Sequence, residues 1–290
     1  MKKRICIISI IIVALLITGF FTLKYLPIGA KQTSTTELPK IEESYPIVVE
    51  QKILKEMIRQ TIFAVAVNDS TKVVHTGIKF EITQGNIRLI ALDGFRLAIR
   101  NEKIDYNEKD VSFIVPSKTL SEIMKIMNDE ESSVSISIGK RHIIFEIGEF
   151  FVISRLLEGE FLNYKTAIPI DCSTTVKVGT KNLIECIERT SLIITDKIKS
   201  PIKCSFSENM INVSSITSIG TAHDKISADI QGNKIEIGFN NKFILDALKV
   251  CDVDEVKIEL NGPTSPIIIL DPESDKFLFL ILPVRLKNEN

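Results

Sequence analysis

The sequence has 290 residues, of which 44% are apolar and 25% charged, and its formal net charge is −1. That length accommodates two domains of typical size with a sizeable hydrophobic core. A net charge so close to zero excludes attraction of the whole molecule to nucleic acid, so any contact with DNA must depend on locally sorted charge. Trp is absent and only four Tyr are present, which argues against an aromatic surface for stacking bases.

The N-terminal segment, residues 1–30, is predicted to be a membrane anchor or a signal peptide. Three basic residues precede a run without charge between Ile5 and Leu23, which would span roughly 28 Å as a helix. The length favours an uncleaved membrane helix. Small residues at Gly29 and Ala30 keep a cleaved signal peptide open as the alternative. Basic residues before the run favour an N-terminus inside the cell, which would place the rest of the chain outside the cytoplasm. Residues 31–44 are polar and predict a solvated linker.

From residue 45 the chain contains two similar units. Residues 78–80 read Ile-Lys-Phe, and the segment 124 residues later reads Ile-Lys-Cys. The same spacing relates apolar and basic positions elsewhere, including Lys118 with Lys242 and Lys125 with Lys249. This period is too long for a solenoid and indicates a duplicated domain. We therefore predict domains at 45–166 and 167–290.

Each unit is predicted to contain two helices among several short strands. The predicted helices cover residues 51–67, 117–128, 180–195 and 240–251. Alternating apolar residues at 134–138 and 256–260 predict strands that follow the second helix of each unit. Few helices and many strands predict an α+β fold, with two helices packed on antiparallel sheet in each unit.

Nothing in the sequence predicts catalysis, a cofactor or a metal site. The three histidines His75, His142 and His223 lie far apart in the sequence, without a nucleophile signature nearby. No glycine-rich phosphate loop precedes a helix. The five cysteines lack metal-ligand spacing and are predicted to be buried thiols in a reducing compartment. They are Cys6, Cys172, Cys186, Cys204 and Cys251. We expect a protein that is not an enzyme.

Three short motifs carry a resemblance to a known family. Residues 92–98 read Leu-Asp-Gly-Phe-Arg-Leu-Ala, residues 161–164 read Phe-Leu-Asn-Tyr, and residues 281–286 read Ile-Leu-Pro-Val-Arg-Leu. In order and spacing they resemble the Thr-Asp-Gly-His-Arg-Leu-Ala, Phe-Pro-Asp-Tyr and Met-Pro-Met-Arg-Leu motifs of bacterial sliding clamps, the beta subunit of DNA polymerase III. The resemblance covers the second and third clamp domains, from about residue 46 to residue 286.

The resemblance implies a fold with sheets outside and helices lining a channel, and non-specific contact with the backbone of double-stranded DNA. Basic residues on or after the helices are the candidate phosphate contacts, because Lys and Arg without aromatic neighbours carry no sequence information. A merely solvated helix face is the alternative for any one of them. The candidates are Lys52, Lys55, Arg59, Lys118, Lys125, Lys181, Arg189, Lys197, Lys199, Lys242 and Lys249.

The resemblance also implies a pocket between the two units that binds linear motifs of polymerase III subunits, the clamp loader and repair proteins. Apolar side chains near a chain end, rimmed by two Arg, suit a peptide that contains Leu and Phe. A simple buried strand is the alternative for residues 277–282. The predicted pocket residues are His75, Leu92, Gly94, Phe95, Arg96, Leu97, Leu162, Ala167, Leu280, Leu282, Pro283, Val284, Arg285 and Leu286. Leu92, Phe95 and Leu162 replace a Thr, a His and a Pro of the family, which makes one wall more apolar.

Two functions remain open at this stage. The first is a sliding-clamp-like processivity factor. In the family two three-domain chains form a six-domain ring, so two-domain chains would need three copies or a partner that supplies first domains. The second is a membrane-tethered relative that captures clamp-binding peptides or clamp subunits without encircling DNA. The family resemblance implies a cytoplasmic protein, and the segment from Ile5 to Leu23 implies association with a membrane.

Overall fold

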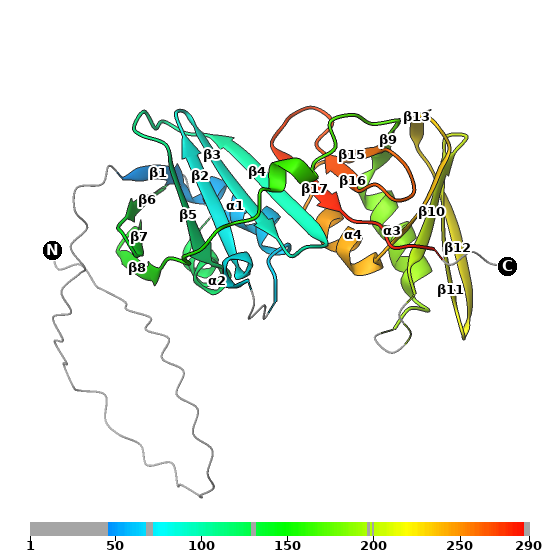
Figure 1. Ribbon diagram of the computed structural model, residues 1–290, viewed down its shortest axis with the longest axis horizontal. Helices are drawn as coiled ribbons and strands as arrows, with labels where there is room; N and C mark the ends of the chain where they lie inside the picture. Colours follow the sequence, from blue (N-terminus) through cyan, green and yellow to red (C-terminus); the bar gives the residue numbers. More distant parts are fainter. Residues whose placement is uncertain (1–45, 68–71, 129–131, 196–197, 199, 287–290) are drawn as a thin grey trace, which may run out of the picture.

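The computed structural model describes residues 46–67, 72–128, 132–195, 198 and 200–286 (Figure 1). The predicted N-terminal helix and linker lie outside these residues, so they stay predictions. In the part of the chain that is described, no helix is long and apolar enough to cross a membrane.

The first unit contains two α-helices and eight strands in its described residues. Its strands are β1 (Ile47–Glu50), β2 (Gly77–Thr83), β3 (Asn86–Leu92), β4 (Arg96–Lys103), β5 (Val111–Pro116), β6 (Ser133–Ile138), β7 (His142–Ile147) and β8 (Phe150–Arg155). Its helices are α1 (Gln51–Ile62), the 3₁₀ turn η1 (Val73–Thr76) and α2 (Ser117–Ile126). A second 3₁₀ turn, η2 (Tyr164–Ala167), lies in the segment that leads to the second unit.

The second unit repeats this order with one additional strand. Its strands are β9 (Thr174–Gly179), β10 (Ile202–Ser207), β11 (Met210–Thr217), β12 (Gly220–Ser227), β13 (Asp229–Gly232), β14 (Ile235–Phe239), β15 (Glu255–Leu260), β16 (Ile267–Leu270) and β17 (Phe277–Ile281). Its helices are α3 (Thr180–Ser191) and α4 (Asn241–Leu248). The two units lie side by side in an elongated molecule, with the second unit at the right of Figure 1.

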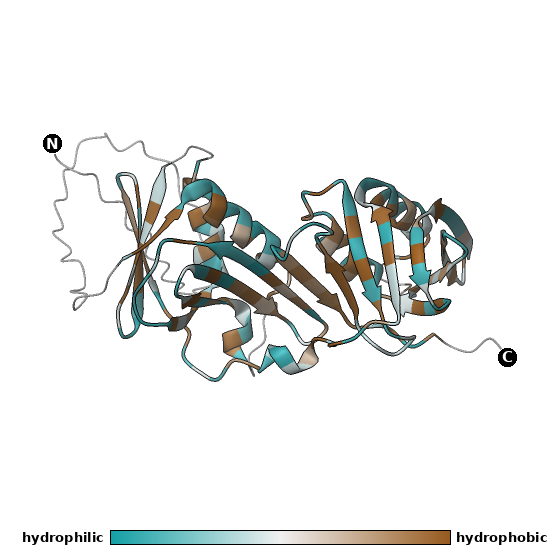
Figure 2. Ribbon diagram, turned by 90° about the horizontal axis from the view of Figure 1, so that it is seen from above, coloured by the Kyte–Doolittle hydropathy of each residue, from teal (hydrophilic) through white to brown (hydrophobic). Residues whose placement is uncertain are grey.

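Three antiparallel sheets form the described part of the molecule. Two have four strands, in the orders β1-β6-β7-β8 and β12-β11-β10-β14. The third has nine strands in the order β13-β9-β15-β16-β17-β4-β3-β2-β5, and it crosses from one unit to the other between β17 and β4. Ile281 pairs with Arg96 and Phe277 with Arg100 at this crossing. The strands there are largely hydrophobic, as the brown ribbons at the centre of Figure 2 show.

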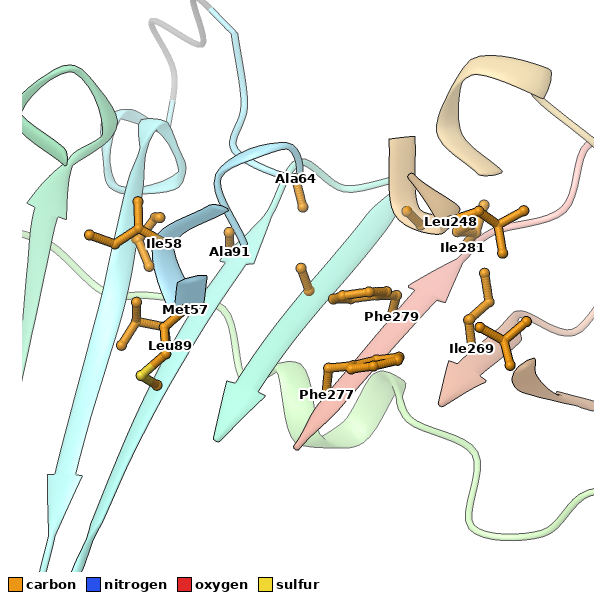
Figure 3. Close-up of a cluster of buried hydrophobic side chains, with 14 of the residues drawn as sticks. Met57, Ile58, Ala64, Leu89, Ala91, Leu248, Ile269, Phe277, Phe279 and Ile281 are labelled. Atoms are coloured by element: carbon orange, nitrogen blue, oxygen red, sulfur yellow. The ribbon is translucent and has the colours of Figure 1, made fainter. Parts of the chain in front are cut away.

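One hydrophobic core extends through both units. Strand β17 places the rings of Phe277 and Phe279 in parallel, with centroids 4.8 Å apart, beside β4 of the first unit (Figure 3). The Phe279 ring also meets the edge of Phe63, at the end of α1, at 5.3 Å. Because both units contribute to this core, burial of apolar area stabilises the junction as well as each unit.

The prediction of an α+β fold with few helices on antiparallel sheets is confirmed. The repeat also appears in the strand register, since Phe80 pairs with Leu89 and Cys204 with Val213. The division into domains at 45–166 and 167–290 stays a prediction.

The predicted C-terminal ends of the four helices were wrong, because each helix stops two to five residues earlier than expected, whereas the predicted starts at residues 51, 117 and 180 are confirmed. The largest difference is in α1, which ends at Ile62 rather than at residue 67. Phe63, the residue that caps the C-terminus of α1, packs against Phe279, more than 200 residues further along the chain. A local apolar period does not show where such a tertiary contact begins.

Candidate functional site

A tight turn between β3 and β4 places Phe95 at the surface. Oδ1 of Asp93 accepts hydrogen bonds from the backbone N–H groups of Phe95 and Arg96, at 2.9 and 3.0 Å. Gly94 has φ +89°, a backbone conformation that L side chains rarely adopt. This local bonding holds the turn, and the Phe95 side chain is 60% exposed.

The C-terminal segment runs directly beside this turn. The backbone N–H of Leu282 donates a 2.9 Å hydrogen bond to the carbonyl of Phe95, and the Phe95 ring stacks on Phe243 of α4 at a centroid distance of 6.0 Å. Leu282 is 38% exposed. Apolar side chains from the turn, from α4 and from the C-terminal segment therefore meet at the junction of the units.

The C-terminal segment after Leu282 packs closely against Gly238 of β14. The N–H of Val284 donates a 2.8 Å hydrogen bond to the Gly238 carbonyl. A Cβ atom at Gly238 would lie only 2.6 Å from the Val284 carbonyl oxygen and 2.7 Å from Cδ2 of Leu286. Only glycine allows so close an approach. Val284 and Arg285 remain exposed, whereas Pro283 and Leu286 are half-buried.

Five of the predicted pocket residues are buried rather than open to solvent, and three of these are leucines. Leu92, Leu97 and Leu280 are each at most 4% exposed and form one cluster with Tyr164 of η2. Phe161 packs against the same cluster. They form an apolar layer beneath residues 156–173, the interdomain segment between β8 and β9, on which Leu162 and Ala167 are exposed.

His75 belongs to the same packed layer. It is buried on η1, and its ring meets Phe161 edge to face at 5.4 Å. The Tyr164 hydroxyl donates a 2.8 Å hydrogen bond to Glu81. Burial alone would raise the pKa of Glu81, but hydrogen bonds from Lys79 and Tyr164 outweigh it and hold the pKa below its usual value. The interdomain segment is thus anchored on the first unit by both packing and charge.

Arg96, one of the two Arg predicted at the rim of the pocket, lies largely buried, and its part in peptide binding stays a prediction. Its side chain is only 8% exposed, and its guanidinium ion-pairs with Asp93 at 3.0 Å and with Asp246 of α4 at 2.6 Å. The guanidinium also lies over the ring of Phe243, 4.5 Å from the centroid. Sequence reasoning missed Phe243 and Asp246, whose roles depend on a contact between helix α4 and a strand about 150 residues earlier.

Most of the described candidate DNA contacts have a carboxylate partner. Arg59 pairs with Glu56 and with Asp252 of the other unit, so its role is at least partly to join the units. The remaining pairs are Lys125–Glu122 at 2.8 Å, Lys181–Glu185 at 4.0 Å, Arg189–Asp224 at 2.8 Å and Lys249–Glu188 at 2.6 Å.

Three candidates, Lys52, Lys118 and Lys242, are exposed, and no ion pair of theirs is found within the described ranges. Lys55 is half-buried. Lys197 and Lys199 lie outside the described residues.

The cysteines differ in exposure. Cys186 and Cys204 are buried and Cys251 is half-buried, whereas Cys172 is exposed, so the prediction of burial was wrong at that position. Burial raises the pKa of the three less exposed thiols to about 12. Between residues 46 and 286, over the described stretches, no three His, Cys, Asp or Glu side chains could hold a metal ion together.

The two units and the junction define a class of protein, two tandem DNA-clamp domains joined edge to edge. Residues 48–163 match the family described as DNA polymerase III beta subunit, central domain, and residues 165–285 match the C-terminal domain of the same subunit. The chain belongs to the DNA polymerase III beta subunit, or beta sliding clamp, family.

Similar proteins and solved structures agree with this family assignment. The beta sliding clamp of Bacillus subtilis (strain 168) is 34% identical over 252 residues, which covers 86% of this chain and 66% of that protein. The beta sliding clamp of Halalkalibacterium halodurans is 33% identical over 254 residues, with coverage of 86% and 67%. This chain therefore spans about two thirds of the length of these relatives.

Among solved structures, the Bacillus subtilis sliding clamp has a TM-score of 0.84 at 34% identity and covers 88% of this chain and 68% of that one. A putative DNA polymerase III beta subunit from Eubacterium rectale has a TM-score of 0.82 at 37% identity, with coverage of 86% and 68%.

Proposed function

We propose that this chain is a sliding-clamp-like accessory factor of DNA replication. It docks short linear motifs of polymerase III subunits, of the clamp loader and of repair proteins at the junction of its two units, and it contacts duplex DNA without sequence preference. The observation that carries the docking function is the adjacency of Phe95 and Leu282. Their side chains are apolar and exposed, and a hydrogen bond joins their backbones. Membership of the beta sliding clamp family supports the same assignment.

The docking surface suits a short apolar peptide. Phe95, Leu282 and Val284 offer apolar area, and the exposed Arg285 is available to a polar or acidic flank. A peptide with Leu and Phe would remove this area from water, worth about 25 cal/mol for each Å² buried. The underlying layer of Leu92, Leu97 and Leu280 holds the surface in place, so little ordering of the protein is needed on binding.

The proposed contact with DNA rests on fewer residues than the sequence indicated. Lys52, Lys118 and Lys242 are the exposed cations that support it best, because ion pairing leaves less charge for phosphates at the other described positions. Each phosphate contact releases counterions, so affinity should fall with salt at a slope of roughly −0.9 per contact. A shallow slope, corresponding to a few contacts, is expected for a protein that slides.

A labelled peptide tests the docking function. A fluorescent Gln-x-x-Leu-Phe-type peptide should bind the full chain saturably, and Phe95→Asp and Leu282→Asp should each weaken binding at least tenfold. Phe150→Asp is the matched control, because Phe150 is also apolar and exposed but lies on β8, in a sheet to which neither the Phe95 turn nor the C-terminal segment belongs. Absence of saturable binding, or equal binding by all four proteins, would refute the assignment.

Two further parts of the proposal concern the location of the protein in the cell. By resemblance to the family we place the protein in the cytoplasm. Membrane attachment between Ile5 and Leu23 stays a prediction from the sequence, and a membrane pelleting assay with and without residues 1–30 would test it.

A further inference from the structure

The sheet β1-β6-β7-β8 turns one face toward the helices and the other away from them. It lies at the left of Figure 1, on the side of the first unit that is away from the second unit. The hydroxyls of Ser154 on β8 and Thr119 on α2 are joined by a 2.7 Å hydrogen bond, and Phe145 of β7 is buried. Successive side chains of a strand point to opposite faces. Arg155, which follows Ser154, and His142, which pairs with Arg155, therefore lie on the outward face.

Basic residues gather at one end of this outward face. Lys140 and Arg141 lie in the turn between β6 and β7, directly before His142. The backbone N–H of Leu156 donates a 2.9 Å hydrogen bond to the Arg141 carbonyl, which holds the end of β8 beside the turn. Arg155 is the last residue of β8. All four basic residues are exposed, so two strands and one turn present them together to solvent.

Little negative charge balances this basic end. Arg141 pairs with Glu158 at 3.2 Å, but the two side chains are 65% and 58% exposed, so water screens the pair. No ion pair of Arg155 is found among the described residues. Glu146 of β7 lies opposite Phe151, nearer to the other end of the sheet. The turn end of the sheet therefore carries a local excess of positive charge.

Apolar side chains lie next to the basic end on the same face. Ile144 and Ile153 pair across β7 and β8 and are half-buried, and Val48 of β1 is exposed. Cations beside partly exposed aliphatic side chains suit the boundary between lipid headgroups and acyl chains, where both are accommodated. Lys52 and Lys118, the proposed DNA contacts of this unit, lie on the helices that cover the opposite face. The basic end is thus a separate surface.

The chain enters this sheet at its basic end. Strand β1 begins at Ile47, opposite Ile136, and runs antiparallel to β6. Because β6 leads into the turn that contains Lys140, β1 begins at the end of the sheet nearest to that turn. In the sequence, 22 residues separate Leu23, the end of the predicted membrane segment, from Pro46. A solvated chain of that length spans about 25 Å on average.

We propose that the basic end of this sheet, formed by Lys140, Arg141, His142 and Arg155, contacts the headgroups of anionic lipids. The contact rests on the proposed membrane attachment through residues 5–23 for its tether. Anionic lipid is the occupant because the charges are complementary and because the predicted membrane segment joins the fold at this end. Each cation strengthens such a contact only about fivefold, so the surface orients a tethered protein rather than anchoring a free one. In this orientation α1 and α2 face away from the lipid.

Fluorescence quenching on vesicles tests the contact in the full chain. In a chain carrying Cys6→Ser and Cys172→Ser, a fluorescent label is attached through Ser137→Cys, on the outward face opposite Ile144. Vesicles of phosphatidylglycerol or of phosphatidylcholine carry a nitroxide on a few headgroups. The label should be quenched more strongly on phosphatidylglycerol. A label attached through Thr264→Cys, in the second unit, should show no difference between the two lipids.

Neutral substitutions separate the charge from the fold. Arg141→Gln with Arg155→Gln should shift the equilibrium away from the contacting state about 25-fold, at about fivefold for each cation. Lys177→Gln with Lys234→Gln removes the same charge from exposed positions of the second unit and should leave the excess quenching unchanged. In about 1 M salt the Debye length falls to about 3 Å, so the excess should disappear in the protein with both arginines intact.

Flotation with the same vesicles separates the contact from its tether. Flotation with neutral vesicles, without excess quenching on anionic ones, would keep the anchor and refute the contact. Flotation with anionic vesicles alone, lost in the double arginine variant, would refute the anchor and support the contact. Flotation with neither would refute both, and excess quenching that survives in the arginine variant would refute the contact.

A different partner would also be recognised. Binding of polyglutamate that depends on Arg141 and Arg155, without any response to lipid, would assign the surface to an acidic protein and overturn the proposal. Docking of peptides at the junction of the units needs no lipid, so the result for this surface and the result for the docking function are independent.

Discussion

Nη1 of Arg96 donates a 2.6 Å hydrogen bond to Oδ2 of Asp246, and so connects strand β4 of the first unit to helix α4 of the second. The guanidinium lies over the rings of Phe63 and Phe243, 5.6 and 4.5 Å from their centroids. A planar cation with two carboxylate partners and two aromatic neighbours is a role that lysine could not fill. Arg96 therefore supports the docking surface from beneath.

Substitution of Asp246 should weaken the junction. Asp246→Asn leaves one charged partner of Arg96 in place and removes the other, so we expect a loss of about 1–2 kcal/mol in the free energy of unfolding. Denaturation in urea would measure it. Asp229→Asn, at an exposed carboxylate on β13, should change stability by less than about 0.5 kcal/mol. Equal effects of the two variants would mean that the Arg96–Asp246 contact contributes nothing.

The shared core predicts that both units unfold together. Phe279→Ala should destabilise the protein by about 3–5 kcal/mol, because it removes a fully buried ring that packs against both units. The described part should still unfold in one transition by circular dichroism. Phe150→Ala, at an exposed position of β8, should cost less than about 1 kcal/mol. Two separate transitions in the unaltered protein would show that the units do not share a core.

Substitution of Gly238 should alter the affinity for peptide more than it alters the stability of the protein. In Gly238→Ala the added Cβ would collide with the Val284 carbonyl and with Leu286, so the C-terminal segment must move away from β14. Peptide affinity should fall about tenfold, equivalent to about 1.4 kcal/mol. Glu236→Ala, on the same strand, should leave affinity unchanged. An unaltered peptide affinity in Gly238→Ala would show that the position of the C-terminal segment does not affect peptide binding.

The raised pKa values predict which cysteines react. The pKa of Cys186, Cys204 and Cys251 is raised to about 12, chiefly by burial, so these thiols stay protonated at neutral and mildly alkaline pH. Only the thiolate is a nucleophile. Iodoacetamide should modify the exposed Cys172 in the native protein, and these three only after unfolding. Peptide mapping by mass spectrometry would detect early modification of any of the three, which would contradict their burial.

Much of the fold was predictable because it depends on local pattern and on duplication. Alternation gave the strands, and a spacing of 124 residues predicted that Lys118 on α2 and Lys242 on α4 hold equivalent positions. The Asp93–Gly94 turn that exposes Phe95 is likewise local, because its hydrogen bonds join residues two and three apart in the sequence.

The rest depended on partners far away in the sequence. A basic residue on a helix face looks the same whether it is free or paired, and only the folded chain brings Asp252 to Arg59 and Asp246 to Arg96. The same holds for Leu97 and Leu280, which the sequence predicted as pocket residues and which the interdomain segment covers. Ion pairs, most of them within one unit, and burial between segments far apart in the sequence are therefore what the sequence pattern could not show at these positions.

The unbroken sheet across the junction has a mechanical consequence. Because β4 and β17 are neighbours in one ladder, the angle between the units is set by the natural twist of adjacent strands and not by the connecting peptide. We therefore expect the two units to behave as one stiff, curved body. Lengthening the connection around residue 170 should therefore leave the curvature of the molecule unchanged, whereas a bulge introduced into β17 should alter it.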